Sequence, residues 1–156
     1  MFLFGNSARG DDALGERLYE RLQQDWDAHN IERHNLDLKL IMGFQLEPEH
    51  IFDLRDADLG IFVDAHHDGS SGIQWREIAA GTTLQFSTHN LPVESLLFLY
   101  ESTFSCSTPP CYLLSIAGES FELGADLSAA AQRNLQTAHE LILEKLQAAA
   151  QRRVLS

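Results

Sequence analysis

The chain alternates between short apolar runs and longer stretches in which apolar residues recur at helical spacing. Residues 1–5 are an apolar run that predicts a short buried strand. From residue 12 to residue 26 the spacing of the apolar side chains predicts an amphipathic helix, through Leu14, Leu18, Leu22 and Trp26. Asp11 or Asp12 stands where the N-cap of this helix belongs, because a carboxylate there can accept a bond from a free N–H group.

The middle of the chain continues the pattern. Residues 31–41 alternate loosely between apolar and polar side chains and predict a second strand. Pro48 then favours the first turn of a short helix. The continuous apolar run 59–63 is typical of a strand covered on both faces, and residues 72–78 predict a further strand.

The rest of the chain predicts a helix, a strand and a second helix. Apolar residues share one helical face over 91–104, and residues 111–116 predict a strand. The final helix is the clearest, with one apolar stripe and with Asp126 or Ser128 available to cap it. Its stripe consists of Leu127, Ala131, Leu135, Ala138, Ile142, Leu146 and Ala149.

This order of elements, β-α-β-α-β-β-α-β-α, predicts an α/β fold with a mostly parallel sheet between two helical layers. We expect a three-layer α/β/α sandwich of about five strands, with one antiparallel strand formed by residues 72–78. Residues 1–156 are expected to form a single domain, because a chain of this length can bury about two thirds of its unfolded surface.

Charge and composition exclude several classes of protein. The formal net charge of −12 argues against a nucleic-acid-binding surface, which needs a basic stripe. No apolar run approaches the roughly 20 residues that span a membrane, and the first run is too short for a secretory signal. Cys106 and Cys111 form a Cys-x4-Cys pair without a second pair, so we expect reduced thiols rather than a disulfide or a metal site. We expect a monomer in the cytoplasm.

Two acidic segments stand where buried strands should stop. Asp11 and Asp12 come soon after the first strand, and Asp64 directly follows the run 61–63. In an open α/β sheet, ligands bind in the crevice at the carboxyl ends of the strands. Carboxylates that arrive there from two strands can share one metal ion.

Each acidic segment also has a purely structural interpretation. Acidic residues at a helix start cap the helix and favour its dipole, and an aspartate after a strand often begins a turn. Two adjacent aspartates cannot occupy one cap position, so the other can point into the crevice. Gly5 and Gly10 would let the loop between them adopt unusual backbone angles.

Histidines supply candidate nitrogen ligands. His89 precedes a predicted helix, and His66 and His67 fit the spacing equally well. Oxygen and imidazole ligands together suit nickel, zinc, iron and similar ions. The chain has no His-Glu-x-x-His zinc motif, no Gly-x-Ser-x-Gly elbow and no Walker loop.

Four ordered segments resemble signatures of the [NiFe]-hydrogenase maturation endopeptidases. The first runs from Gly5 to Gly15 and reads Gly-Asn-x-x-Arg-Gly-Asp-Asp-x-x-Gly. The second is Phe-Val-Asp-Ala over residues 62–65, the third is Ser-Thr-His-x-Leu over 87–91, and the fourth covers 118–128. The resemblance extends over nearly the whole chain.

The resemblance implies a site and an activity. In that family the metal ligands are a carboxylate of the first motif, the aspartate of the second and the histidine, which correspond to Asp12, Asp64 and His89 here. These three are the expected catalytic and metal-binding residues, and Asp11 is expected to support the loop and the helix start. The family removes a C-terminal extension from the hydrogenase large-subunit precursor after nickel insertion. Nickel supplied by that precursor is therefore the expected metal, with cadmium or zinc as surrogates.

The chain also departs from the family pattern. Leu3 stands where many members have a glycine, and residues 42–49 stand where many have an Asp-Gly-Gly-Thr-like segment used in substrate selection. The Gln-Leu-x-Pro-Glu form of this stretch resembles the branch that serves bidirectional cytoplasmic hydrogenases. Gly43 and Gln45 are candidate substrate-binding residues, and a simple turn before a helix is the structural alternative.

Two other functions fit parts of the sequence. A non-catalytic metal-binding or chaperone-like module that docks on the precursor would use the same three residues. A nucleotide-binding α/β domain is disfavoured, because the phosphate-loop lysine is missing and the crevice is acidic.

Overall fold

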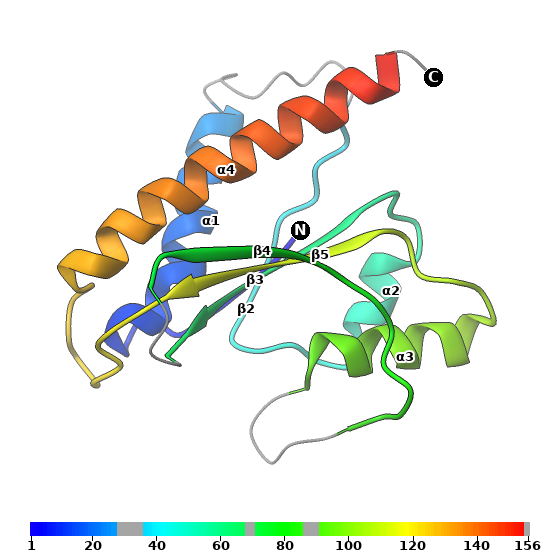
Figure 1. Cartoon of the computed structure of the whole chain (residues 1–156), viewed down its shortest axis with the longest axis horizontal. Helices are drawn as coiled ribbons and strands as arrows, with labels where there is room; N and C mark the ends of the chain where they lie inside the picture. The colour runs from blue at the N-terminus through cyan, green and yellow to red at the C-terminus, as the bar shows by residue number, and fades with distance from the viewer. Residues whose placement is uncertain (28–35, 68–70, 86–90, 155–156) are drawn as a thin grey trace.

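The computed structural model describes residues 1–27, 36–67, 71–85 and 91–154. One five-stranded sheet crosses it, with the strand order β2-β1-β3-β5-β4. Helices lie on both sides of this sheet (Figure 1). The predicted α/β/α sandwich is confirmed, including the mostly parallel sheet with one antiparallel strand.

Four strands of the sheet are parallel. β1 (Phe2–Phe4) lies between β2 (Ile41–Gly43) and β3 (Gly60–His66). β5 (Cys111–Ala117) pairs in parallel with β3 on its other side. β4 (Ile73–Ile78) lies antiparallel to β5 at the edge, as the sequence predicted for this segment.

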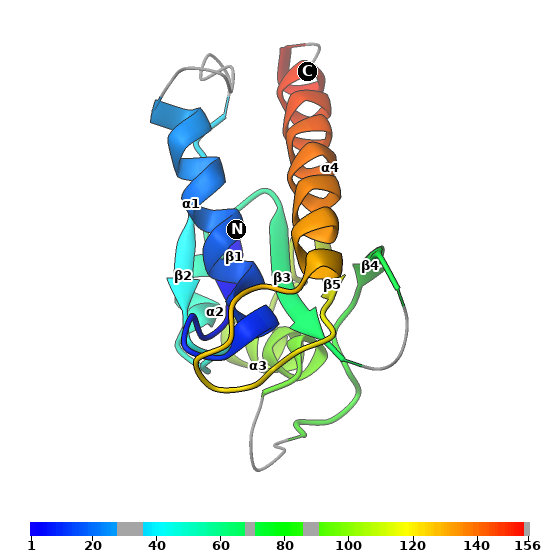
Figure 2. The same ribbon diagram turned by 90° about the vertical axis from the view of Figure 1, so that its left-hand side faces the viewer.

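The helices form two layers. α1 (Leu14–Asp27) and α4 (Ala129–Val154) pack on one face of the sheet, and α2 (His50–Leu54) and α3 (Val93–Phe104) pack on the other. Figure 2 shows α1 and α4 side by side. A 3-10 helix, η1 (Gly10–Ala13), leads directly into α1.

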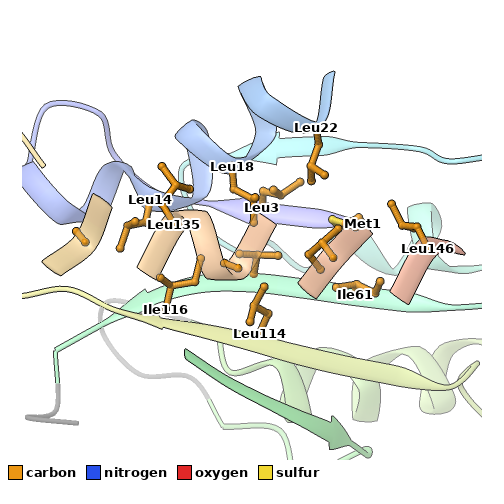
Figure 3. Packing of buried hydrophobic residues seen from close by; sticks show 14 residues of the cluster. Met1, Leu3, Leu14, Leu18, Leu22, Ile61, Leu114, Ile116, Leu135 and Leu146 are labelled. Atoms are coloured by element: carbon orange, nitrogen blue, oxygen red, sulfur yellow. The ribbon is translucent and has the colours of Figure 1, made fainter. Parts of the chain in front are cut away.

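The strands supply both cores because successive residues of a strand point to opposite faces. In β1, Leu3 is fully buried on the α1–α4 side, whereas Phe2 and Phe4 face α2 and α3. Phe2 stacks on Phe62 of β3 with ring centroids 4.8 Å apart. Figure 3 shows the cluster on the α1–α4 side, where leucines of both helices meet residues of β1, β3 and β5.

The predicted strand over residues 31–41 is wrong in its extent. Only Ile41–Gly43 pairs with β1, residues 36–40 have no regular secondary structure, and residues 31–35 lie outside the described residues. Leu36, Leu38 and Leu40 pack, partly buried, against the α1–α4 core cluster. Their alternation therefore reflects contact with the core and not strand pairing.

The final helix is close to its prediction. Ser128 caps it, because its hydroxyl oxygen accepts a bond from the N–H of Ala131 at 3.0 Å. The apolar stripe is buried from Ala131 to Leu146, and Ala150 is buried at its end where Ala149 was predicted. None of the helices in the described part of the chain is both long and apolar enough to cross a membrane. Cys106 and Cys111 are free thiols, as expected.

Candidate active site

The carboxyl ends of β1 and β3 place two aspartates beside one pocket. The strands are adjacent and parallel, with Leu3 opposite Val63, so both end at the same edge of the sheet. Asp64 follows Val63 in β3, and Asp12 lies in η1, after the loop that leaves β1. Both line a pocket of about 420 Å³. The predicted convergence is therefore present for these two residues, although β3 continues beyond Asp64 to His66 and does not stop before it.

The loop between β1 and η1 depends on two glycines. A Cβ atom on Gly5 would lie 2.1 Å from the carbonyl oxygen of Asp12, so only glycine lets the loop fold back on η1. The N–H of Asn6 donates to the same carbonyl at 3.1 Å. Gly10 has a φ of 52°, in the left-handed region that glycine adopts without steric cost. These contacts fix the backbone that carries Asp12.

Asp11 points away from the pocket and into the protein. Its carboxylate is fully buried and accepts four hydrogen bonds. They come from the N–H of Glu119 at 2.7 Å, the N–H of Ser120 at 3.0 Å, and both the N–H and the hydroxyl of Ser128 at 2.7 Å. The N–H of Asp11 also donates to the carbonyl of Ser120 at 2.7 Å. Asp11 thus attaches η1 to the segment between β5 and α4.

These bonds correct one prediction and favour another. Neither Asp11 nor Asp12 caps α1; the Asp11 carboxylate instead accepts bonds from N–H groups of the segment that joins β5 to α4. Burial opposes ionisation of Asp11, but the bonds from Ser120, Glu119 and Ser128 outweigh it and lower its pKa. A stable buried carboxylate of this kind fits the expected supporting role of Asp11, although its partners lie far along the chain.

Asp12 and Asp64 have the opposite electrostatic character. Burial raises the pKa of Asp64 to about 6, and the neighbouring Asp12 carboxylate adds to this, against the N–H of Ala65, which lowers it. Burial also raises the pKa of Asp12, while the Arg9 guanidinium acts to lower it. Two partly buried carboxylates that repel each other are stabilised by a shared cation.

The histidines are not brought to this pocket by the described structure. His89 lies in residues 86–90, outside the described residues. The Nδ1 of His67 lies 3.1 Å from the carbonyl oxygen of Gly118, and its ring packs edge-on against Phe121. Neither His66 nor His67 is among the residues that line the pocket.

Several of the solved structures that match this chain are of hydrogenase maturation proteases. A [NiFe] hydrogenase maturation protease, HycI from Thermococcus kodakarensis, matches with a TM-score of 0.67 and 24% identity over 94% of this chain and 90% of the other. The hydrogenase maturating endopeptidase HybD from E. coli matches with a TM-score of 0.69 and 19% identity over 95% and 91%. A hydrogenase 2 maturation peptidase from a Thaumarchaeota archaeon matches with a TM-score of 0.61 and 22% identity over 94% and 96%.

This chain has the fold of the [NiFe]-hydrogenase maturation proteases. No family model matches the sequence, and no curated protein is significantly similar to it. The likeness is therefore one of structure, with low sequence identity.

Within this protease fold, the two candidate substrate-binding residues differ in position. Gln45 lines the pocket, together with the exposed ring of Phe44. Gly43 does not line it; its carbonyl accepts a bond from the N–H of Gly5 at 3.2 Å and so ties the end of β2 to the first loop. The segment after β2 forms one wall of the pocket.

Several residues of the site were not singled out from the sequence. Arg9 and Phe44 line the pocket, and the start of α3 contributes Val93 and Glu94. For Arg9, its position three residues before Asp12 was the one feature of the sequence that could have indicated a place in the pocket. Phe44 gave none, because an apolar residue beside a strand is usually buried, whereas Phe44 is 69% exposed.

The donor set of the pocket fits a divalent metal ion. Carboxylate oxygens are good ligands for such ions, and a cation would offset the burial and the repulsion by Asp12 that together raise the pKa of Asp64. Among the described residues, no three His, Cys, Asp or Glu side chains form a complete metal cluster. A third protein ligand for such an ion would have to come from outside the described residues, where His89 is the expected candidate.

Proposed function

We propose that this chain is a maturation endopeptidase that removes the C-terminal extension of a [NiFe]-hydrogenase large-subunit precursor after nickel insertion. The observation that carries the proposal is the convergence of Asp12 and Asp64 on one pocket at the carboxyl edge of the sheet. The structural neighbours named as hydrogenase maturation proteases support it.

The two aspartates and His89 are proposed to complete the coordination of nickel that the precursor carries. Nickel held there would polarise the scissile carbonyl and lower the pKa of bound water. Asp12 and Asp64 would offer oxygen ligands from fixed backbone positions, since η1 is anchored through Asp11 and Asp64 lies in a central strand. Preorganised ligands of this kind need little rearrangement when the substrate binds.

The other walls of the pocket suit a peptide. Phe4, Phe62, Leu91 and Leu113 give it apolar walls. Phe44 and Gln45 would contact the substrate from the segment after β2. We further propose that this segment selects the precursor of a bidirectional cytoplasmic hydrogenase, on the resemblance of residues 42–49 to that branch.

Cleavage of the precursor by the purified protein is the direct test. The nickel-loaded precursor is incubated with the protein, and mass spectrometry measures loss of the extension. We expect cleavage of the nickel-loaded precursor and none of the metal-free form. The Ser102→Ala variant on the surface of α3 is a matched control that should cleave normally, because Ser102 is exposed and does not line the pocket.

The same experiment separates the proposal from its main rival. Binding of the precursor without any mass loss would support a non-catalytic metal-binding or chaperone-like module. Equal cleavage of loaded and metal-free precursor would refute the dependence on nickel while leaving the endopeptidase activity in place.

A further inference from the structure

Arg9 gives the pocket its only basic side chain among the described residues. Three lining side chains there carry N–H donors, namely Asn6, Arg9 and Gln45. Gln45 already donates to the Glu47 carboxylate, and the Oδ1 of Asn6 accepts a bond from the N–H of Ala8 at 3.0 Å. Arg9 is therefore the one positive charge that can meet an anionic group of a substrate in this pocket.

The Arg9 side chain is anchored on one side only. Its Nε donates to the carbonyl of Phe121 at 3.4 Å, and its two terminal amino groups have no hydrogen bond to a described residue. No carboxylate of the described residues forms an ion pair with it. An exposed arginine with both terminal amino groups available can bind a carboxylate through two parallel bonds.

The backbone of Arg9 is held firmly. Its N–H donates to the carbonyl of Asn6 and its own carbonyl accepts from Asp12, both at 3.0 Å. The preceding carbonyl, of Ala8, accepts a bond from the N–H of Gly124 at 2.7 Å. A guanidinium on a fixed backbone loses less freedom on binding than one on a mobile loop.

We propose that Arg9 binds a carboxylate of the peptide substrate and so sets which peptide bond lies beside Asp12 and Asp64. This inference rests on the proposed endopeptidase function. The planar guanidinium matches a carboxylate in shape and charge, whereas the two aspartates repel an anion that approaches them. The carboxylate is either the terminal α-carboxylate or an acidic side chain of the extension.

A simpler role for Arg9 is to balance the charge of Asp12. Lysine keeps that charge but loses the planar fork, and glutamine loses both. The two roles therefore separate in the variants Arg9→Lys and Arg9→Gln. A binding role predicts a change in KM with kcat nearly constant, because the interaction is present before the reaction begins.

The test measures cleavage of the nickel-loaded precursor by wild type, Arg9→Gln and Arg9→Lys. We expect Arg9→Gln to raise KM about 10- to 100-fold, as loss of a hydrogen-bonded charge pair does, with kcat within about twofold. The KM of Arg9→Lys should fall between those of the wild type and Arg9→Gln. Arg17→Gln is the matched control, since Arg17 is exposed, pairs with Glu20 and lies outside the pocket. A loss confined to kcat, or no loss, would overturn the proposal.

Altered precursors identify the carboxylate. Two glycines appended to the C-terminus displace the α-carboxylate, and Asp→Asn or Glu→Gln changes in the extension remove the side-chain charges. One of these changes should raise KM for the wild type and have no further effect in Arg9→Gln. Purely additive effects in every pair would overturn the assignment.

Equilibrium binding separates this inference from the proposed function. Fluorescence anisotropy with labelled precursor measures affinity in the Asp64→Asn background, where no cleavage is needed. Binding that depends on Arg9 without cleavage by the wild type would refute the peptidase and leave the Arg9 assignment standing. Cleavage with a KM that does not change when Arg9 is replaced would refute the Arg9 assignment and leave the peptidase function standing.

Discussion

Asp11 and Asp12 are neighbours in the chain, but their carboxylates lie in opposite environments. Asp11 is fully buried, accepts four hydrogen bonds and has a lowered pKa. Asp12 faces the pocket with Asp64, has no hydrogen bond from a described residue to its carboxylate, and has a raised pKa. A buried carboxylate that accepts hydrogen bonds stabilises a fold, whereas a partly buried carboxylate without such bonds marks a place where a ligand can bind.

The largest expected difference between the two is in activity. Asp12→Asn, Asp64→Asn and His89→Ala should each lower the rate of precursor cleavage by about 10³-fold, because each removes a proposed metal ligand worth several kcal/mol. Mass spectrometry of the processed precursor measures the rate. Full activity in any one variant would remove that residue from the mechanism.

Stability should show the reverse pattern. Asp11→Ala leaves three backbone N–H groups and one hydroxyl without their acceptor, which should lower the free energy of unfolding by about 3–5 kcal/mol. Asp12→Ala is the matched control and should stay within about 1 kcal/mol of wild type. Urea unfolding measures both.

The pH dependence of the Asp11→Ala effect follows from its lowered pKa. The stability that Asp11 contributes is present above its unfolded pKa and is lost only as the pH falls through its folded pKa. The loss in Asp11→Ala should therefore be equal at pH 5 and pH 8. A loss that shrinks already at pH 5 would contradict the lowered pKa.

Asp64 should respond in the opposite direction. Its folded pKa of about 6 exceeds the ordinary 3.8, so the native state retains a proton that the unfolded chain has lost. Its contribution to stability therefore falls as the pH rises from about 4 to about 6. Asp64→Asn should raise the free energy of unfolding by about 2–3 kcal/mol at pH 8 and leave it unchanged at pH 4.

The Asp64→Asn comparison has to be made with a chelator present. A bound cation would stabilise the wild type and hide the gain. Equal free energies of unfolding of wild type and variant at pH 8 under these conditions would show that the Asp64 carboxylate does not destabilise the folded protein.

The smallest expected effect concerns Ser128, which donates to Asp11 and caps α4. Ser128→Ala should lower the free energy of unfolding by about 1–2 kcal/mol, as the loss of an N-cap does. Ser128→Thr keeps the hydroxyl and should retain most of that stability, which thermal unfolding can measure. Equal losses in the two variants would mean that the hydroxyl is not what matters.

The sequence was sufficient for most of the fold. The order of helices and strands follows from apolar spacing, which depends only on which face of each element is buried. The strand over 31–41 failed because Leu36, Leu38 and Leu40 touch the core without pairing. Alternation of apolar and polar residues indicates which side chains are buried, and burial alone does not specify a hydrogen-bonded neighbouring strand.

The site was predictable to a similar degree. The pairing of Asp12 with Asp64 follows from two strand ends that meet at one edge. The partners of Asp11 do not, because three of its four bonds come from backbone N–H groups, which every non-proline residue possesses. A contact with Glu119 or Ser120 made through the main chain leaves no mark in the side chains.

The hydrogen bonds of Asp11 also determine when η1 can reach its final position during synthesis of the chain. They join residues 108 to 117 positions apart in the chain, and β5, which lies between β3 and β4 in the sheet, comes after the other described strands in the sequence. Such contacts can form only once both parts of the chain have been synthesised. During translation, β1, η1 and β3 emerge well before the partners that fix Asp11. The backbone that carries Asp12 is therefore anchored through Asp11 only after residues 119–128 have been synthesised, well after Asp64.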